Sequence, residues 1–278
     1  MLAKTYEVAK LKELARECRI DIIKMLAEAG NGHPGGSLSE IEILVALYAH
    51  EMNHDPSNRC KPGRDRFVLS KGHGIPGLYA IMANVGYWAR EDLLSLRKLG
   101  SPFQGHPDRC RLNGLEASTG SLGQGLSIAV GLALASKLER DNFRVYCLVG
   151  DGESQEGQIW EAAMSASKYK LDNMICILDY NKAQIDGYVE DVMPIEPVAD
   201  KWISFGWHVI QIDGHNFEQI IAAFDEAKSV KGKPTFIIAD TVKGKGVSFM
   251  ENKVDWHGVA PSAEQAEQAL QELYDTSH

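Results

Sequence analysis

An open α/β sheet, doubly wound and mostly parallel with helices on both faces, is the fold that this sequence predicts. Short apolar runs bounded by turn residues recur along the chain, at 67–70, 145–150, 174–180, 207–213 and 235–240. Helical patterns of ten or more residues separate the last four runs, and this alternation is typical of parallel strands joined by helical crossovers. Strands buried on both faces are expected to be this uniformly apolar.

The N-terminal segment shows helical periodicity. Apolar residues recur on one helical face until Gly30: Val8, Leu11, Leu14, Cys18, Ile22 and Leu26. We therefore expect a helix over 8–29 that stops at this glycine. A polar loop at 31–37 should follow, and Ser39 with Glu42 three residues on has the pattern of a capping box at the start of a second helix. No linker, repeat or low-complexity tract divides the chain, so residues 1–278 are expected to form a single domain.

The composition excludes several classes of protein. The chain has 278 residues, 44% of them hydrophobic, and a formal net charge of −9 without any Lys/Arg block, which argues against nucleic-acid binding. Charges interrupt the N-terminal segment where a signal peptide needs an apolar run, and no stretch is long enough to span a membrane, so we expect a cytoplasmic protein. The five cysteines form no CxxC pair and should be reduced and mostly buried.

The sharpest chemical signal lies between Gly150 and Gly187. Asp151 directly follows one predicted strand and Asn181 follows the next, so both should emerge at the carboxyl edge of the sheet, where open α/β folds bind ligands. A carboxylate, an amide oxygen and a nearby backbone carbonyl suit Mg²⁺ or Ca²⁺ bound to a diphosphate. Alone, each of these residues is more simply explained as part of a turn.

Four histidines lie in loops rich in glycine or proline: His33, His73, His106 and His257. A lone histidine is usually a surface or core residue, but four in such loops indicate a common site. Imidazoles can hydrogen-bond sugar hydroxyls or a diphosphate, and they can move protons near neutral pH. The other histidines for which no role is predicted are His50, His54, His208 and His215.

These motifs follow one another in an order that resembles the N-terminal, diphosphate-binding domain of transketolases, over nearly the whole chain. The segments that carry the resemblance are GHPGGSLSEIEILVALY, LSKGHG, GHPD, STGSLGQGLSIAVG, GDGESQEGQIWEAA, DYNKAQIDG and KGKGVSFMENKVDWHG. Motifs in a fixed order are far more specific than any one of them.

The resemblance implies roles for individual residues. Asp151, Asn181 and the carbonyl of Ala183 would hold the metal, Mg²⁺ or else Ca²⁺ or Mn²⁺, with Gly152 near the diphosphate of thiamine diphosphate. His73 and His257 would contact the diphosphate or the reacting sugar. His33 and His106 would contact the sugar.

Further roles implied by the resemblance concern the cofactor rings and a partner. The backbone at Gly120 and Leu122 would lie along the rings, although many relatives have proline where this chain has Ser121. Glu156, and with it Glu161, would face a partner and link two active sites, giving Glu156 a part in catalysis and cofactor binding. Lys245 would help to neutralise the diphosphate.

The activity implied is transfer of a two-carbon ketol unit from a ketose, often phosphorylated, to an aldose. Three alternatives remain open. The chain could belong to a two-subunit 2-oxoacid decarboxylase or dehydrogenase, to an enzyme like deoxyxylulose phosphate synthase, or to an inactive regulatory paralogue. The loop histidines favour transketolase, while the sequence does not identify either sugar.

The resemblance also implies a second polypeptide. In transketolases a glutamate that activates the aminopyrimidine ring comes from a second domain, and only one amphipathic segment follows DWHG in this sequence. We expect a companion chain with the pyrimidine-binding and C-terminal domains, in a two-plus-two heterotetramer. The alternative is that Glu156 activates the ring in a homodimer.

Overall fold

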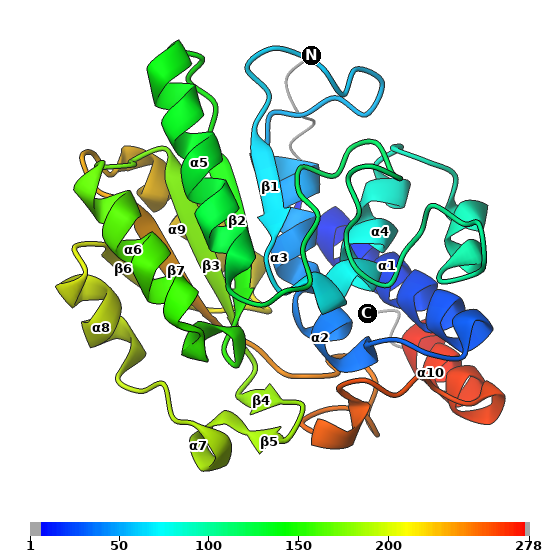
Figure 1. The fold of residues 1–278 in the computed structure, drawn as a ribbon. Coiled ribbons are helices and arrows are strands. Elements are labelled where there is room, and N and C mark those ends of the chain that lie inside the picture. The colour runs from blue at the N-terminus through cyan, green and yellow to red at the C-terminus, as the bar shows by residue number, and fades with distance from the viewer. Residues whose placement is uncertain (1–6, 276–278) are drawn as a thin grey trace.

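The computed structural model describes residues 7–275 and contains a central sheet of five strands in the order β1-β2-β3-β7-β6. All neighbouring strands are parallel (Figure 1). The strands are β1 (Arg66–Leu69), β2 (Val145–Gly150), β3 (Met174–Tyr180), β6 (His208–Asp213) and β7 (Thr235–Asp240). Each coincides with an apolar run in the sequence, and the predicted parallel α/β fold is confirmed.

Helices cover both faces of the sheet. Successive residues of each strand point to opposite faces, and the apolar side chains on each face pack against helices. On β2, Tyr146 and Leu148 join one hydrophobic core, whereas Cys147 and Val149 join the other. The first core includes α1 (Val8–Ala29), α3 (Ile41–Ala46), α4 (Ile75–Asn84), α9 (Phe217–Ser229) and α10 (Ala263–Asp275). The second includes α5 (Gln124–Glu139), α6 (Gly157–Lys168) and α8 (Val198–Ser204), which lie in front of the sheet in Figure 1.

The strand register brings several loops to one edge of the sheet. Gly150 at the end of β2 pairs with Asp179 near the end of β3, and Asp179 pairs with Ala239 of β7. The segments that follow β2, β3 and β7 therefore start side by side, as the parallel arrangement requires. Beyond β3, a short antiparallel hairpin of β4 (Ala183–Gln184) and β5 (Gly187–Tyr188) extends below this edge (Figure 1).

The segment between the first two predicted helices differs from expectation. Helix α2 (Pro34–Ser39) begins inside the predicted loop, with Pro34 at a first-turn position where a missing N–H costs nothing. Ser39 ends this helix, and its hydroxyl donates to Oδ2 of Asp179 at 2.6 Å. The predicted capping box is wrong: helix α3 has no side-chain cap, and the Ser39 hydroxyl donates to a buried carboxylate, a strong charged acceptor, instead of accepting from a helix N–H.

Short elements complete the described chain and mostly shape its loops. They are a π-helix η1 (Leu47–Glu51), the 3₁₀ helices η2 (Gly72–Gly74), η3 (Arg90–Ser95), η4 (Glu153–Gln155) and η5 (Val254–Trp256), and the helix α7 (Val189–Val192). Cys18, Cys147 and Cys176 are buried, Cys60 and Cys110 are exposed, and all are free thiols. Within residues 7–275, the helices are all too short or too polar to cross a membrane.

The second core gives a test of the fold. Trp202 of α8 is fully buried and stacks on Phe236 of β7, with ring centroids 3.7 Å apart. Trp202→Ala should lower the free energy of unfolding by about 3–5 kcal/mol, since it leaves a large cavity beside the sheet. Urea unfolding followed by circular dichroism measures the change. The neighbouring Ile203, 56% exposed, provides the control Ile203→Ala. Equal losses in both variants would contradict the packing.

Candidate active site at the carboxyl edge of the sheet

A cavity of about 340 Å³ opens where the strands end. Its walls come from the segments after β1, β2, β3 and β7, from the N-terminus of α2 and from the loops around residues 106 and 120. It brings together most of the residues predicted from the sequence: His33, His73, His106, Gly120, Leu122, Asp151, Gly152, Glu156, Asn181, Ala183 and His257. Segments far apart in the chain thus build one site.

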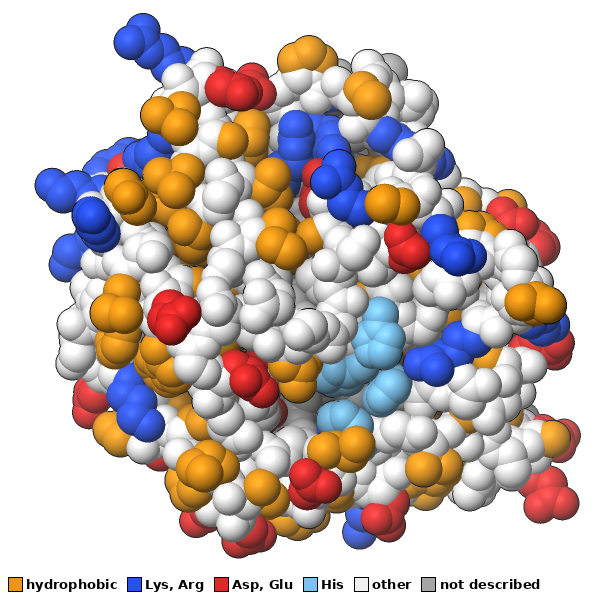
Figure 2. Space-filling view, viewed as in Figure 1, with side chains coloured by type: hydrophobic (Ala, Val, Ile, Leu, Met, Phe, Trp, Pro, Cys, Tyr) orange, Lys and Arg blue, Asp and Glu red, His pale blue; other side chains and the backbone are white. Residues whose placement is uncertain are grey.

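The four loop histidines form a cluster at this cavity. The ring centroids of His73 and His257 are 5.1 Å apart, and the His33 ring lies 5.3 Å from that of His73 and 6.2 Å from that of His106. Figure 2 shows histidine side chains gathered in a hollow of the viewed face. His106 is the exposed member, so it marks the mouth of the cavity.

Desolvation and nearby positive charges keep these histidines neutral. Desolvation, reinforced by nearby positive charge, lowers the pKa of His33 to about 4 and the pKa of His257 to about 3. The same causes hold the pKa of His73 well below its ordinary value, and desolvation with the Arg97 charge lowers that of His106. Each ring therefore has one donor and one acceptor nitrogen at neutral pH, as hydrogen bonding to sugar hydroxyls requires.

The predicted oxygen donors lie together beneath the histidines. Asn181 donates its amide N–H to Oδ2 of Asp179 at 3.0 Å, which orients the amide. The Oδ1 atom of Asn181 accepts from the backbone N–H of Ala183 at 3.2 Å and lines the cavity as a further oxygen donor. Asp151 accepts from the backbone of Gly152 at 2.7 Å and from that of Lys182. In the described part of the chain, no group of three or more His, Cys, Asp and Glu residues is placed to hold a metal. Any cation here must use amide and carbonyl oxygens as well.

The charge of Asp151 is poorly compensated. Burial and the nearby carboxylate of Asp179 raise the pKa of Asp151 to about 7. A bound cation would reverse both effects, because an opposite charge favours the ionised form. The site thus has the electrostatic character of a cation site.

A buried lysine that the sequence reasoning missed supports the cavity floor. The Nζ atom of Lys71, just beyond β1, lies 2.5 Å from Oδ2 of Asp179 and 2.7 Å from Oε2 of Glu40. Burial raises the pKa of Glu40 to about 8, although the Lys71 charge opposes this. The strand-end position of Lys71 was visible in the sequence, but its two carboxylate partners come from distant segments.

Lys243, rather than Lys245, points into the cavity. Its Nζ atom lies 2.8 Å from the carbonyl oxygen of Ala183 and 2.8 Å from Nδ1 of His257. Lys245 lies outside the cavity lining and pairs with Glu251 at 3.3 Å. Gly244 between them has a φ of +77°, and this left-handed turn sends the two lysines in different directions.

Two glutamates on the segment after β2 differ sharply. Glu153, which the sequence reasoning passed over, is buried and accepts from the hydroxyl of Ser70 at 2.5 Å and from the backbone of Gly123 and Gly150 at 2.9 and 3.1 Å. It fixes the loop that carries Gly120 and Leu122. Glu156 is exposed at the cavity rim.

Glu161 lies further along, exposed on α6 and outside the cavity lining. Gly120 has a φ of +136° and lies so close to His106 that a Cβ atom would meet its ring at 2.9 Å. The glycine is therefore required by both its backbone conformation and the close histidine.

Comparison with known proteins identifies the family. Residues 10–276 match the model of the transketolase thiamine diphosphate binding domain. The chain is 48% identical to a 6-deoxy-6-sulfo-D-fructose transketolase subunit from Clostridium sp., covering 95% of this chain and 96% of the relative. It is 41% identical to an apulose-4-phosphate transketolase subunit from Phocaeicola vulgatus, covering 96% of this chain and 95% of the relative.

Longer relatives match only in part. Human transketolase is 43% identical over 95% of this chain but 42% of its own length. The crystal structure of Campylobacter jejuni transketolase superimposes with a TM-score of 0.91 at 35% identity, covering 97% of this chain and 43% of that one. The chain thus spans about two fifths of these longer proteins, and it belongs to the transketolase family as a thiamine diphosphate binding domain.

Proposed function

We propose that this chain is the diphosphate- and metal-binding subunit of a two-chain transketolase, which transfers a two-carbon ketol unit from a ketose to an aldose. The observation that carries the proposal is the cavity in which neutral histidines lie above the oxygen donors at the sheet edge. The relatives named as subunits are matched over almost their entire length, which supports a chain of this extent as one subunit.

The oxygen donors fit a divalent metal. Asp151 and Asn181 provide a carboxylate and an amide oxygen, and the carbonyl of Ala183 already accepts from a cationic group, the Lys243 ammonium. Hard oxygen ligands suit Mg²⁺, Ca²⁺ or Mn²⁺. We assign these three groups to the metal, which would also offset the raised pKa of Asp151.

The cavity floor fits a diphosphate. Lys243 is buried at 1% exposure, and burial lowers its pKa to about 8 although the charge of Asp151 opposes this. A dianionic group beside Lys243 would stabilise its charged form further and would accept hydrogen bonds from it. His257 lies next to this ammonium and His73 lies beside His257, and both rings can donate to the same oxygens.

The histidines nearer the mouth fit the sugar. When bound, thiamine diphosphate supplies the nucleophilic carbon and the electron sink that ketol transfer requires. His33 and His106 bind and orient sugar hydroxyls, and a neutral ring can take a proton from a hydroxyl at one nitrogen. His73 and His257, at the base, hold the reacting end of the sugar and exclude water from it.

An anionic sugar is the substrate class we assign. The relatives named above are transketolase subunits for a sulfonated and a phosphorylated sugar. At the mouth of the cavity, the exposed Arg97 lies against Gly105. Desolvation is the main cause that lowers the pKa of His33 and of His106, and the nearby charge of Arg97 adds to it. A sugar with its charged end outward would meet this guanidinium.

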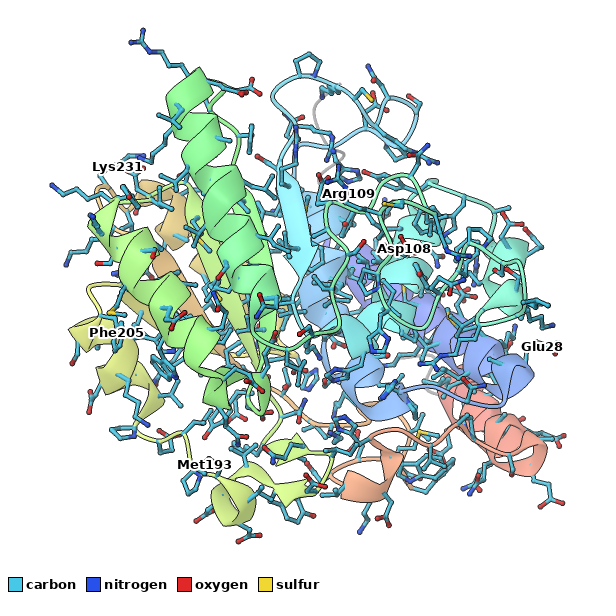
Figure 3. The ribbon with its side chains drawn as sticks, in the orientation of Figure 1. Glu28, Asp108, Arg109, Met193, Phe205 and Lys231 are labelled. Atoms are coloured by element: carbon cyan, nitrogen blue, oxygen red, sulfur yellow. The ribbon has the colours of Figure 1, made fainter. Side chains whose placement is uncertain are left out.

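The partner is a second chain that supplies the ring-activating acid. Among the described carboxylates at the cavity, Asp151 and Glu153 are occupied by hydrogen bonds, and Glu156 lies exposed at the rim. Exposed apolar side chains beside the cavity suit an interface: Leu122, Ile185, Tyr188, Val192 and Met193, the last at the lower edge of Figure 3. We assign a two-plus-two assembly in which Glu156 faces the partner.

The metal assignment predicts that Asp151→Ala and Asn181→Ala each weaken thiamine diphosphate binding by about a hundredfold or more, since each removes a metal ligand. Isothermal titration of the assembled enzyme with cofactor and Mg²⁺ measures the affinity. Asp240→Asn is the control, because Asp240 also ends a strand but pairs with Lys182 outside the cavity. Unchanged affinity in both alanine variants would refute the assignment.

His106→Ala should lower kcat by about a hundredfold and change cofactor affinity little, because His106 is assigned to the sugar. Steady-state rates and the thermal midpoint are measured together. His54 is the structural control. Its ring hydrogen-bonds the carbonyl of Tyr48 at 2.6 Å, and it does not line the cavity. His54→Ala should lower the midpoint and keep the rate per folded molecule. If His106→Ala behaves in the same way, the catalytic role is wrong.

The partner assignment predicts that the purified chain with cofactor and Mg²⁺ does not transfer ketol units, whereas the chain co-expressed with its partner does. The assay uses xylulose 5-phosphate and ribose 5-phosphate, followed by a sulfonated ketose donor. Co-expressed Asp151→Ala is the control, and it should abolish transfer. Robust transfer by the chain alone would contradict the two-chain proposal, and release of carbon dioxide from a 2-oxoacid would favour a decarboxylase.

A further inference from the structure

The segment 241–246 carries Lys243 into the cavity, and side chains on the opposite side hold two of its backbone groups. It leaves β7 and turns at Gly244, with Lys243 directed toward Ala183 and His257. Thr241 and Val242 form part of another cleft, and His215 contributes to the wall of that cleft. The backbone of this segment is thus the partition between the cofactor cavity and its neighbour.

His215, for which the sequence predicted no role, holds this partition in a defined tautomer. The backbone N–H of Val242 donates to Nε2 of His215 at 2.8 Å. Because a backbone N–H can only donate, Nε2 has no proton, and Nδ1 must have it. Nδ1 lies 2.9 Å from Oε2 of Glu42 and donates to it. The neutral ring thus bridges a carboxylate and the backbone next to Lys243.

Glu42 and Arg19 complete the contact from the far side. Two guanidinium nitrogens of Arg19 lie 2.7 and 2.8 Å from the two carboxylate oxygens of Glu42. Burial opposes the charge of Glu42, but Arg19 and His215 outweigh it and hold its pKa at about 2. The third nitrogen of Arg19, Nε, donates to the carbonyl oxygen of Lys245 at 2.9 Å.

We propose that His215, Glu42 and Arg19 form a positioning clamp for Lys243. The clamp fixes the backbone at Val242 and at Lys245, on both sides of the lysine that meets the diphosphate. Such a clamp is needed because a buried ammonium gains by moving out to water, and a fixed backbone restricts that movement. His215 does not touch the cavity and acts only through Lys243.

Two substitutions of His215 separate the two hydrogen bonds. The amide of asparagine lies near the position of Nδ1, so His215→Asn can keep the bond to Glu42 but cannot reach the N–H of Val242. Glutamine extends to the position of Nε2, so His215→Gln can still accept from Val242. His208→Asn is the matched control, since His208 begins β6, the strand that ends just before His215, and its ring bonds the exposed Glu226.

Hydrogen exchange of the full chain without cofactor tests the clamp directly. In His215→Asn, amides in 241–246 should exchange about tenfold faster, as expected when one hydrogen bond is lost. In His215→Gln and His208→Asn they should exchange as in the unaltered chain. Unchanged exchange in His215→Asn would overturn the proposal. If this variant does not fold, Arg19→Lys replaces it, because it loses the bond from Nε to Lys245 and should accelerate the same amides.

Cofactor affinity tests whether the clamp acts through Lys243, a step that rests on the proposed function. His215→Asn should raise the Kd for thiamine diphosphate with Mg²⁺ in the assembled enzyme about tenfold. In a Lys243→Met background, His215→Asn should raise this Kd less than about twofold, because the effects of two coupled residues are not additive. Equal factors in both backgrounds would overturn the coupling. If the unaltered enzyme binds no cofactor but amides 241–246 still exchange faster in His215→Asn, the proposed function is refuted and the clamp is retained.

Discussion

The carboxylate of Asp179 is the group on which the architecture of the site depends. It is fully buried at the end of β3 and accepts hydrogen bonds from Ser39 of α2, from Lys71 after β1, from Asn181 and from the hydroxyl of Thr241 after β7. Burial disfavours its charge, but Lys71 outweighs this and keeps its pKa below the ordinary value. One ionised group therefore joins three strand ends and a helix, and each partner is oriented by it.

The same charge prepares the neighbouring positions for a cation. Asp179 holds the amide nitrogen of Asn181, so the amide oxygen of Asn181 is directed away from it, toward Ala183. Burial is the main cause that raises the pKa of Asp151, and the charge of Asp179 adds to it. Two carboxylates close to one another are stable only with compensating positive charge. Lys71 compensates one of them in the protein itself, while Lys243 approaches the other from the opposite wall. A metal and a diphosphate would complete a charge pattern that the fold has already arranged.

The features that could be predicted from the sequence are those that depend on local patterns of residues. Apolar runs identified all five strands of the main sheet, and Asp151 and Asn181 were placed correctly because parallel strands share their carboxyl edge. The sequence could not show which of two lysines faces inward, because the backbone N–H at the left-handed turn of Gly244 donates to the carbonyl of Gly35, far away in the chain. Ser39 was misread for a similar reason, since its acceptor lies 140 residues away.

The cavity changes in polarity from base to mouth, and this gradient matches a ligand of two chemical halves. Charged groups such as Lys71, Asp151 and Lys243 lie buried at the sheet edge, whereas the histidines above them are held neutral by desolvation. Charged oxygens of a cofactor gain most at the base, where fixed groups replace water. Neutral rings above can exchange hydrogen bonds with hydroxyls without a net charge to desolvate. The order of these layers along the cavity would thus orient a diphosphate inward and a sugar outward, as the proposed function requires.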